Sequence, residues 1–203
     1  SNNWAGYIYS QLGETEHAIE ILMKNLDYAE REDISEYLPE VNLMLGFAYR
    51  DFKDNTNALK YFEAAKESAE QTGAEGHLST ILNEIGNLNS ISGNTRAGLE
   101  FQMKALEMRK KQNNLALVGF SYNDIANSYF LAKDHLKAIQ YFKESLKIQK
   151  QLSNDWAAFY CYVNIASIFH ELKKNALQKA YLDSAKTVSD ELRLKPVYQL
   201  YYE

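Results

Sequence analysis

Residues 44–62, MLGFAYRDFKDNTNALKYF, hold the pattern that decides the fold, and residues 124–142, DIANSYFLAKDHLKAIQYF, repeat it. Each stretch has a small residue at its third position, a tyrosine three residues later, and an alanine twelve residues after the small one. Apolar residues spaced by three and four positions lie on one face of an α-helix. The polar run between the two apolar halves is typical of a turn. Each stretch therefore predicts a helix, a short turn and a second helix.

The small residue of the first helix recurs every 40 positions, at Gly6, Gly46, Gly86, Ala126 and Ala166. A second small residue follows in the second helix, at Ala18, Ala58, Gly98 and Ala138. Small side chains on both partners let two antiparallel helices approach closely. A period of this length indicates stacked helical repeats, whose free surface usually binds a partner. We therefore predict an all-α solenoid of about five repeats in a single domain, 1–203, with repeats at about 1–33, 34–73, 74–113, 114–153 and 154–194.

Breaks between the predicted repeats carry turn and cap residues. Gly73 is predicted to end a helix as its C-cap, and Ser153 and Asp155 are predicted as N-caps. Pro196 suits the first turn of a further, partial helix over 195–203. The apolar closing residues YQLYYE are unlike the polar outer face of a terminal repeat, so we expect this chain to be a piece of a longer protein.

Composition argues against several kinds of function. The net charge of -5 comes from 27 acidic and 22 basic residues dispersed along the chain, without a dense Lys/Arg stripe for nucleic acid. Cys161, the single cysteine, lies in an apolar stretch and is expected to be a buried hydrophobe. No apolar run reaches the length of a membrane span and no leader opens the sequence, so we predict no membrane insertion by this segment.

The histidines do not form a catalytic pattern. They fall in different repeats, without the HExxH spacing or a cysteine partner that a zinc site needs. We therefore predict no metal site, no cofactor and no enzymatic activity. The four residues are His17, His77, His135 and His170.

The small residue, the aromatic three positions later and the alanine twelve positions later resemble the tetratricopeptide repeat family across nearly the whole chain. The 40-residue period is similar to that of the long-repeat members found in kinesin light chains, bacterial peptide-pheromone regulators and sensor segments of bacterial two-component proteins. The resemblance implies a right-handed α-α superhelix. Two positions depart from the pattern, Asn89 in place of an aromatic residue and Gln178 in place of alanine, and we expect shifted or loose packing there.

The resemblance also implies a binding site, because the first helices of successive repeats line the groove in this family. Asn83 and Asn87, and Asn123 and Asn127, are i, i+4 pairs on these helices. An amide side chain offers a donor and an acceptor, which matches an extended peptide backbone. The predicted peptide-binding residues are Asn83, Asn87, Asn123, Asn127 and Asn164, with Arg50, Ser90, Phe120, Phe130, Tyr160 and His170 around them.

Some members of the family clamp a C-terminal carboxylate with Lys and Arg on these helices. This chain has no cation at the corresponding positions, which are Leu43, Thr80, Phe120, Glu84 and Asp124. We therefore predict a neutral or basic peptide or protein ligand, read by the sensor or interaction domain of a bacterial signalling or regulatory protein.

Two alternatives stay open at this point. Asparagines also occur at helix–helix seams, where their amides bond a neighbouring backbone. The array is alternatively an assembly scaffold, such as a homodimer, without a ligand in the groove. The compartment, cytoplasmic or periplasmic, is not decided by the sequence.

Overall fold

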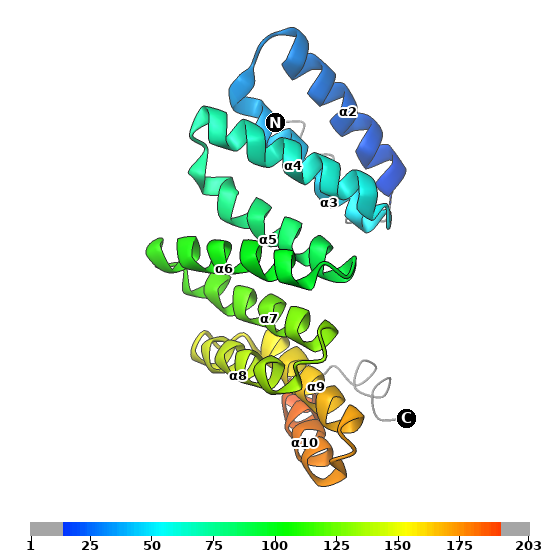
Figure 1. The fold of residues 1–203 in the computed structure, drawn as a ribbon, viewed down its shortest axis with the longest axis vertical. Helices are drawn as coiled ribbons and strands as arrows, with labels where there is room; N and C mark the ends of the chain where they lie inside the picture. Colours follow the sequence, from blue (N-terminus) through cyan, green and yellow to red (C-terminus); the bar gives the residue numbers. More distant parts are fainter. Residues whose placement is uncertain (1–13, 192–203) are drawn as a thin grey trace. The chain divides into compact units, whose positions relative to one another are not determined.

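The computed structural model describes residues 14–191, and every regular element in that range is helical (Figure 1). The predicted first helix around Gly6 and the predicted partial helix over 195–203 lie outside the described residues. The elements are α2 (Thr15–Arg31), the 3-10 turn η1 (Ser35–Tyr37), α3 (Leu38–Asp51), α4 (Asn55–Thr72), α5 (Glu75–Ile91), α6 (Thr95–Lys111), α7 (Leu115–Leu131), α8 (His135–Gln151), α9 (Asp155–Glu171) and α10 (Asn175–Glu191).

The chain divides into two compact units, residues 1–92 and 93–203, here called the N-terminal and the C-terminal unit. Helices α2 to α5 belong to the N-terminal unit, and α6 to α10 belong to the C-terminal unit. Within each unit, consecutive helices joined by short turns pack against each other, α3 on α4, α7 on α8 and α9 on α10. The predicted all-α fold of helix–turn–helix repeats is confirmed. A single domain over 1–203 stays a prediction.

A residue with positive φ ends the helices at intervals of 20 residues. The φ values lie between 52° and 90° at Asp33, Lys53, Gly73, Gly93, Asn113, Lys133, Ser153 and Lys173. After each of them except Gly93, the following N–H donates to the carbonyl five residues earlier, as Asp134 N does to Tyr129 O at 2.9 Å. This is the Schellman arrangement, which satisfies carbonyls that a helix end would leave without partners. Gly73 is therefore a helix C-cap, as predicted.

The predicted N-caps near residue 154 were wrong by one position in each direction. Asn154 is the N-cap of α9, and its side chain accepts a hydrogen bond from Ala157 N at 3.3 Å. Ser153 has a φ of 52°, and Asp155 is the first helical residue. Asp54 and Asp134 cap α4 and α8 in the same way, and these backbone hydrogen bonds hold the pKa of both carboxyl groups below the ordinary value.

Small residues permit close helix contacts, as the sequence predicts. A Cβ built on Gly46 would lie 2.4 Å from the ring of Phe62, so α3 and α4 meet at a distance that only glycine allows here. An aromatic pair fills the space beside this contact in three repeats. The ring pairs are Tyr49–Tyr61, Tyr129–Tyr141 and Phe169–Tyr181, with centroids 5.2, 5.4 and 5.5 Å apart.

The two departures from the pattern have different consequences. Asn89, in the place of the aromatic residue, turns its amide back to Ile85 O of its own helix at 2.9 Å. Gln178 is half-buried in α10, yet Phe169 still contacts Tyr181 and the α9–α10 packing is kept. The expected loosening is therefore absent between α9 and α10.

Two further predictions concern Cys161 and the membrane. Cys161 is buried, as predicted, and burial raises the pKa of its thiol. Over residues 14–191, none of the helices combines the length and the apolar character that crossing a membrane requires.

Candidate functional site

Seven of the eleven predicted site residues lie on α7 and α9, which are both in the C-terminal unit. The two helices share a core that includes Ala126 of α7 and Ile165 of α9. Helix α7 carries Phe120, Asn123, Asn127 and Phe130, and α9 carries Tyr160, Asn164 and His170. The structure therefore brings these residues to two neighbouring helices of one unit.

Exposed aromatic side chains mark the first halves of both helices. Phe120 is 43% exposed and Tyr160 36%, although both are large apolar groups. Trp156, which the sequence reasoning missed, is 44% exposed, and its ring meets that of Tyr160 edge-on with centroids 5.3 Å apart. Its signal in the sequence was the i, i+4 spacing to Tyr160. Large exposed aromatic groups close together are typical of binding surfaces.

Three asparagines follow these aromatic residues one turn further along. Asn123, Asn127 and Asn164 are half-buried. Within residues 14–191 their amides have no recorded hydrogen bond, ion pair or other polar contact. Since half-buried amides normally find partners, these groups are available to a ligand. We call Phe120, Asn123, Asn127, Trp156, Tyr160 and Asn164 the amide–aromatic face.

The predicted asparagines of the N-terminal unit differ from those of the face. Asn83 on α5 is only 3% exposed, and Ser90 of the same helix is also 3% exposed. Asn87 is half-buried, and both Asn83 and Asn87 are engaged in interactions within the chain. Burial and existing partners suit a structural role better than contact with a ligand.

Arg50, predicted to tune charge specificity, is occupied by neighbouring groups. Its guanidinium lies 2.9 Å from a carboxylate oxygen of Glu84 on α5 and 3.1 Å from Asp51, and it covers the ring of Phe47. Burial works against the charge, but the two carboxylates outweigh it and raise the pKa of Arg50. Glu84 is thus neutralised by Arg50, and its side chain is only 14% exposed.

At the other end of α7 and α9, charged groups surround Phe130. Lys133 Nζ lies 3.2 Å from Glu171 Oε2 and stands over the Phe130 ring, and His135 Nε2 lies 3.5 Å from the same carboxylate oxygen. Phe130 is half-buried beneath this group, whereas His170 is exposed. At this end the charged groups contact one another and cover Phe130, so its side chains are less available to a ligand than those of the aromatic end.

Comparison with known proteins agrees with this geometry. Tetratricopeptide repeat models match residues 37–111 and residues 1–31 and 121–152, which together make up more than half of the chain. The chain belongs to the tetratricopeptide repeat family. The resemblance drawn from its sequence pattern is thereby confirmed.

The proteins to which this tetratricopeptide repeat chain is similar include a transcriptional activator. The transcriptional activator NprA of Geobacillus stearothermophilus is 22% identical over 155 residues, which cover 76% of this chain and 38% of the activator. A solved Rap protein in complex with Competence and Sporulation Factor superposes with a TM-score of 0.82 at 14% identity, covering 98% of this chain and 55% of that one. A kinesin light chain with nearly identical repeats from Podosopora anserina gives a TM-score of 0.77 at 15% identity, with 95% of both chains covered.

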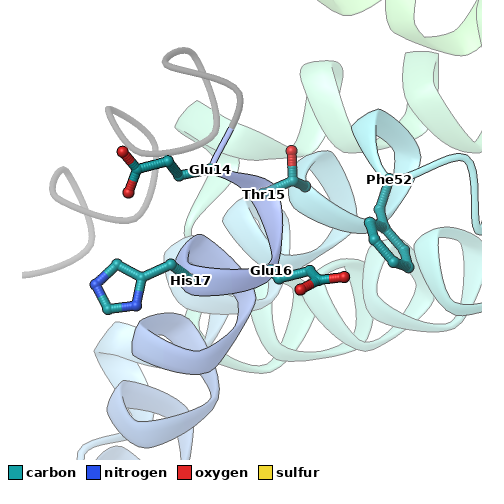
Figure 2. Close-up of a pocket in the computed structure, with 5 residues that line it drawn as sticks. All are labelled: Glu14, Thr15, Glu16, His17 and Phe52. Atoms are coloured by element: carbon teal, nitrogen blue, oxygen red, sulfur yellow. The ribbon is translucent and has the colours of Figure 1, made fainter.

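A hollow in the N-terminal unit is lined by none of the predicted site residues. It has a volume of about 410 Å³ and is lined by Glu14, Thr15, Glu16, His17 and Phe52. In Figure 2, Glu16 and Phe52 occupy the same side of this hollow, while Glu14 and His17 project on the other side. Glu14, Glu16 and His17 do not converge on one point, and no cluster of three metal-ligating side chains occurs over residues 14–191.

Proposed function

We propose that the amide–aromatic face binds an extended peptide segment of a protein partner. The observation that carries this proposal is the set of unengaged amides at Asn123, Asn127 and Asn164, beside the exposed rings of Phe120, Trp156 and Tyr160. An extended peptide presents N–H and C=O groups alternately, and an asparagine amide matches both. Asparagine in mid-helix costs about 0.5 to 0.7 kcal/mol relative to alanine, so three such residues need another reason to be there.

The aromatic part of the face adds to the affinity that the amides supply. Three amides that each make one hydrogen bond contribute roughly 3 kcal/mol, which on its own gives weaker than millimolar binding. Fully burying an exposed apolar side chain contributes about 1.5 to 3 kcal/mol, and each of these rings, already more than half buried, gains part of that when a ligand covers it. A ligand therefore needs contacts to the rings as well as to the amides to offset the cost of ordering a peptide. The amides then fix the direction and register of the ligand.

The chemistry of the face favours a neutral or basic ligand. None of the six residues of the face is a cation, so an acidic C-terminus has no partner among them. Asp124, next to Asn123 on α7, is half-buried. In the N-terminal unit, the preference for a basic ligand that Glu84 suggested is offset by the ion pair of Glu84 with Arg50. The argument for a basic ligand therefore rests on the C-terminal unit.

The relatives support a regulatory context for this binding. The Rap protein of similar fold is complexed with Competence and Sporulation Factor, and NprA is a transcriptional activator. We infer that this chain is the sensor or interaction segment of a bacterial regulatory protein. The chain spans 38% of NprA, so an output activity would belong to other parts of such a protein.

Peptide display followed by calorimetry tests the proposal. Peptides selected on the wild-type chain are titrated into wild type and into an Asn123→Ala/Asn127→Ala variant. Loss of two hydrogen bonds predicts binding at least tenfold weaker in the variant. A Gln140→Ala/Asn175→Ala variant, altered at two exposed positions of α8 and α10, is the matched control and keeps wild-type affinity. Equal binding by all three proteins would contradict the proposal.

A further inference from the structure

Four of the exposed leucines of the C-terminal unit lie at the α7–α8 and α9–α10 turns. Leu136, near the start of α8, is 82% exposed, and Leu131, Leu172 and Leu177 are 49%, 37% and 43% exposed. A single exposed leucine is ordinary in a folded protein, but a group of them is costly and marks an interaction surface. All four lie in or beside the α7–α8 and α9–α10 turns.

Contacts of the Glu171 carboxylate place these two turns side by side. Glu171, at the end of α9, binds Lys133 at 3.2 Å and His135 at 3.5 Å, and both partners belong to the α7–α8 turn or the start of α8. Leu136 directly follows His135, and Leu172 directly follows Glu171. The leucines of the two turns therefore belong to one surface and are not scattered.

This surface continues into a groove of about 880 Å³. Leu99 and Met103 of α6 line the groove together with Tyr129 and Ala132, while Asp134 and Lys137 stand at its edge. Leu131 and Leu136 flank the turn that contains Ala132 and Asp134. The exposed leucines of the α7–α8 turn therefore lie next to the residues that line the groove.

The 40-residue repeat explains how this surface becomes apolar. Three positions that line the groove are Arg96, Ala132 and Lys137. Forty residues further along, the same positions of the repeat are Leu136, Leu172 and Leu177. At each of these positions the later repeat has a larger apolar side chain or an apolar side chain in place of a cation. The two cations that are replaced are Arg96 and Lys137. The last repeat is therefore more apolar than the repeat before it at the positions of Leu172 and Leu177, and the fourth repeat is more apolar than the third at the position of Leu136.

Lysines without partners surround the leucines. Lys133 pairs with Glu171 and Lys137 with Asp134 at 3.1 Å. For Lys173, Lys174 and Lys179, in contrast, the described part of the chain offers no ion pair. The surface therefore has an excess of positive charge although the whole chain carries -5. We call Leu131, Leu136, Leu172, Leu177, Lys173, Lys174 and Lys179 the leucine–lysine edge.

We propose that the leucine–lysine edge docks an acidic amphipathic helix of another protein. Leucines of the incoming helix cover the exposed leucines and enter the groove between α6 and α8, since helices pack by setting side-chain ridges into such grooves. Its Glu or Asp residues pair with Lys173, Lys174 and Lys179, and this charge complementarity selects the partner. The edge and the amide–aromatic face share no residue, so the two sites are independent.

The chemistry of the edge favours a protein helix over an anionic lipid surface. Lipid-binding surfaces usually carry Trp, Tyr or Phe among their basic residues. The seven residues of the edge include no aromatic side chain, and beside them Asp134 and Glu171 pair with Lys137 and Lys133. Paired carboxylates at fixed positions suit a partner with a defined charge pattern.

Fluorescence anisotropy with a designed peptide tests this proposal. The probe is an 18-residue helix with leucines along one face and glutamates on its flanks, and a peptide with lysines in place of the glutamates is the comparison. We expect the acidic probe to bind wild type, and to bind a Leu136→Asn/Leu172→Asn variant at least tenfold more weakly. A Lys173→Glu/Lys174→Glu/Lys179→Glu variant is expected to lose the acidic probe and to gain the basic one.

Control variants separate the edge from other surfaces. Leu152→Asn changes a leucine that is 40% exposed at the opposite turn, and Lys147→Glu changes an exposed lysine of α8. Both are expected to bind the acidic probe as wild type does, and so is Asn123→Ala/Asn127→Ala. Circular dichroism confirms that each variant is folded.

Several outcomes would overturn the proposal. Equal affinity for the acidic and the basic peptide, or equal losses in the control variants, would show non-specific apolar binding. Binding to phosphatidylserine vesicles that Leu136→Asn/Leu172→Asn abolishes, without binding of the acidic peptide, would assign the edge to a membrane. A concentration-dependent doubling of mass that the same variant abolishes would assign it to a second copy of the chain.

Discussion

Gly46 shows at the residue scale why the small position of the repeat must be small. A Cβ at this position would lie 2.4 Å from two carbons of the Phe62 ring, and the ring is fully buried with little room to move. Overpacking of this kind costs about 1 to 3 kcal/mol. Ala126 holds the same position of the repeat beside Phe142, so the local helix distance differs between repeats.

We therefore expect Gly46→Ala to lower the free energy of unfolding by about 1 to 3 kcal/mol. Urea unfolding followed by circular dichroism measures the change. Gly76→Ala is the matched control, because a Cβ at Gly76 meets no atom within 4 Å and Gly76 lies near the start of α5. The control is expected to be neutral or stabilising, since alanine favours a helix over glycine by about 1 kcal/mol. Equal effects of both variants would contradict this account of the contact.

At the element scale, the turns between helices show how the helix ends are fixed. A left-handed residue ends the helix every 20 positions, yet six of the eight such residues are not glycine. A side chain in this conformation costs roughly 1 kcal/mol, so the chain accepts strain at the same place in each half-repeat. The Schellman hydrogen bonds that follow the six non-glycine residues keep the helix ends in place despite the strain.

Adding a glycine at one of these turns and removing one from another are expected to change the free energy of unfolding in opposite directions. Lys53 has a φ of 67° and an exposed side chain, so Lys53→Gly is expected to stabilise the protein by about 0.5 to 1 kcal/mol. Gly73 has a φ of 69° with no atom within 4 Å of a built Cβ, so Gly73→Ala is expected to cost about 1 kcal/mol through backbone strain alone. Thermal or urea unfolding measures both. Changes of the same sign would show that turn strain is not the cause.

At the scale of the whole molecule, the repeat pattern predicted the fold well. The 40-residue period gave the helices, their order and the turn positions, because each small residue and each aromatic partner is required by helix packing. Capping was less predictable, since Ser153, Asn154 and Asp155 are all good N-cap residues. Only the position of the left-handed residue shows which of them is the cap.

The candidate site was predictable only in part. The repeat position predicted that Phe120, Asn123 and Tyr160 lie on the first helices of their repeats, and α7 and α9 carry them, but it assigned Asn83 the same role as Asn123. Burial of Asn83 and the free amide of Asn123 depend on neighbouring side chains that differ between repeats. The exposed leucines of the C-terminal unit had no signal in the sequence, because leucine in a helix normally predicts core.

The emission of Trp156 tests the central claim, peptide binding at the amide–aromatic face, most directly. The chain has two tryptophans, so a Trp4→Phe variant leaves Trp156 as the single reporter. Trp156 is 44% exposed and contacts Tyr160, and a peptide on the face would cover it. A display-selected peptide is expected to shift the emission to shorter wavelength with the midpoint that calorimetry gives, and Asn123→Ala/Asn127→Ala is expected to raise that midpoint at least tenfold. Calorimetric binding that leaves the Trp156 emission unchanged would place the ligand elsewhere and contradict the claim.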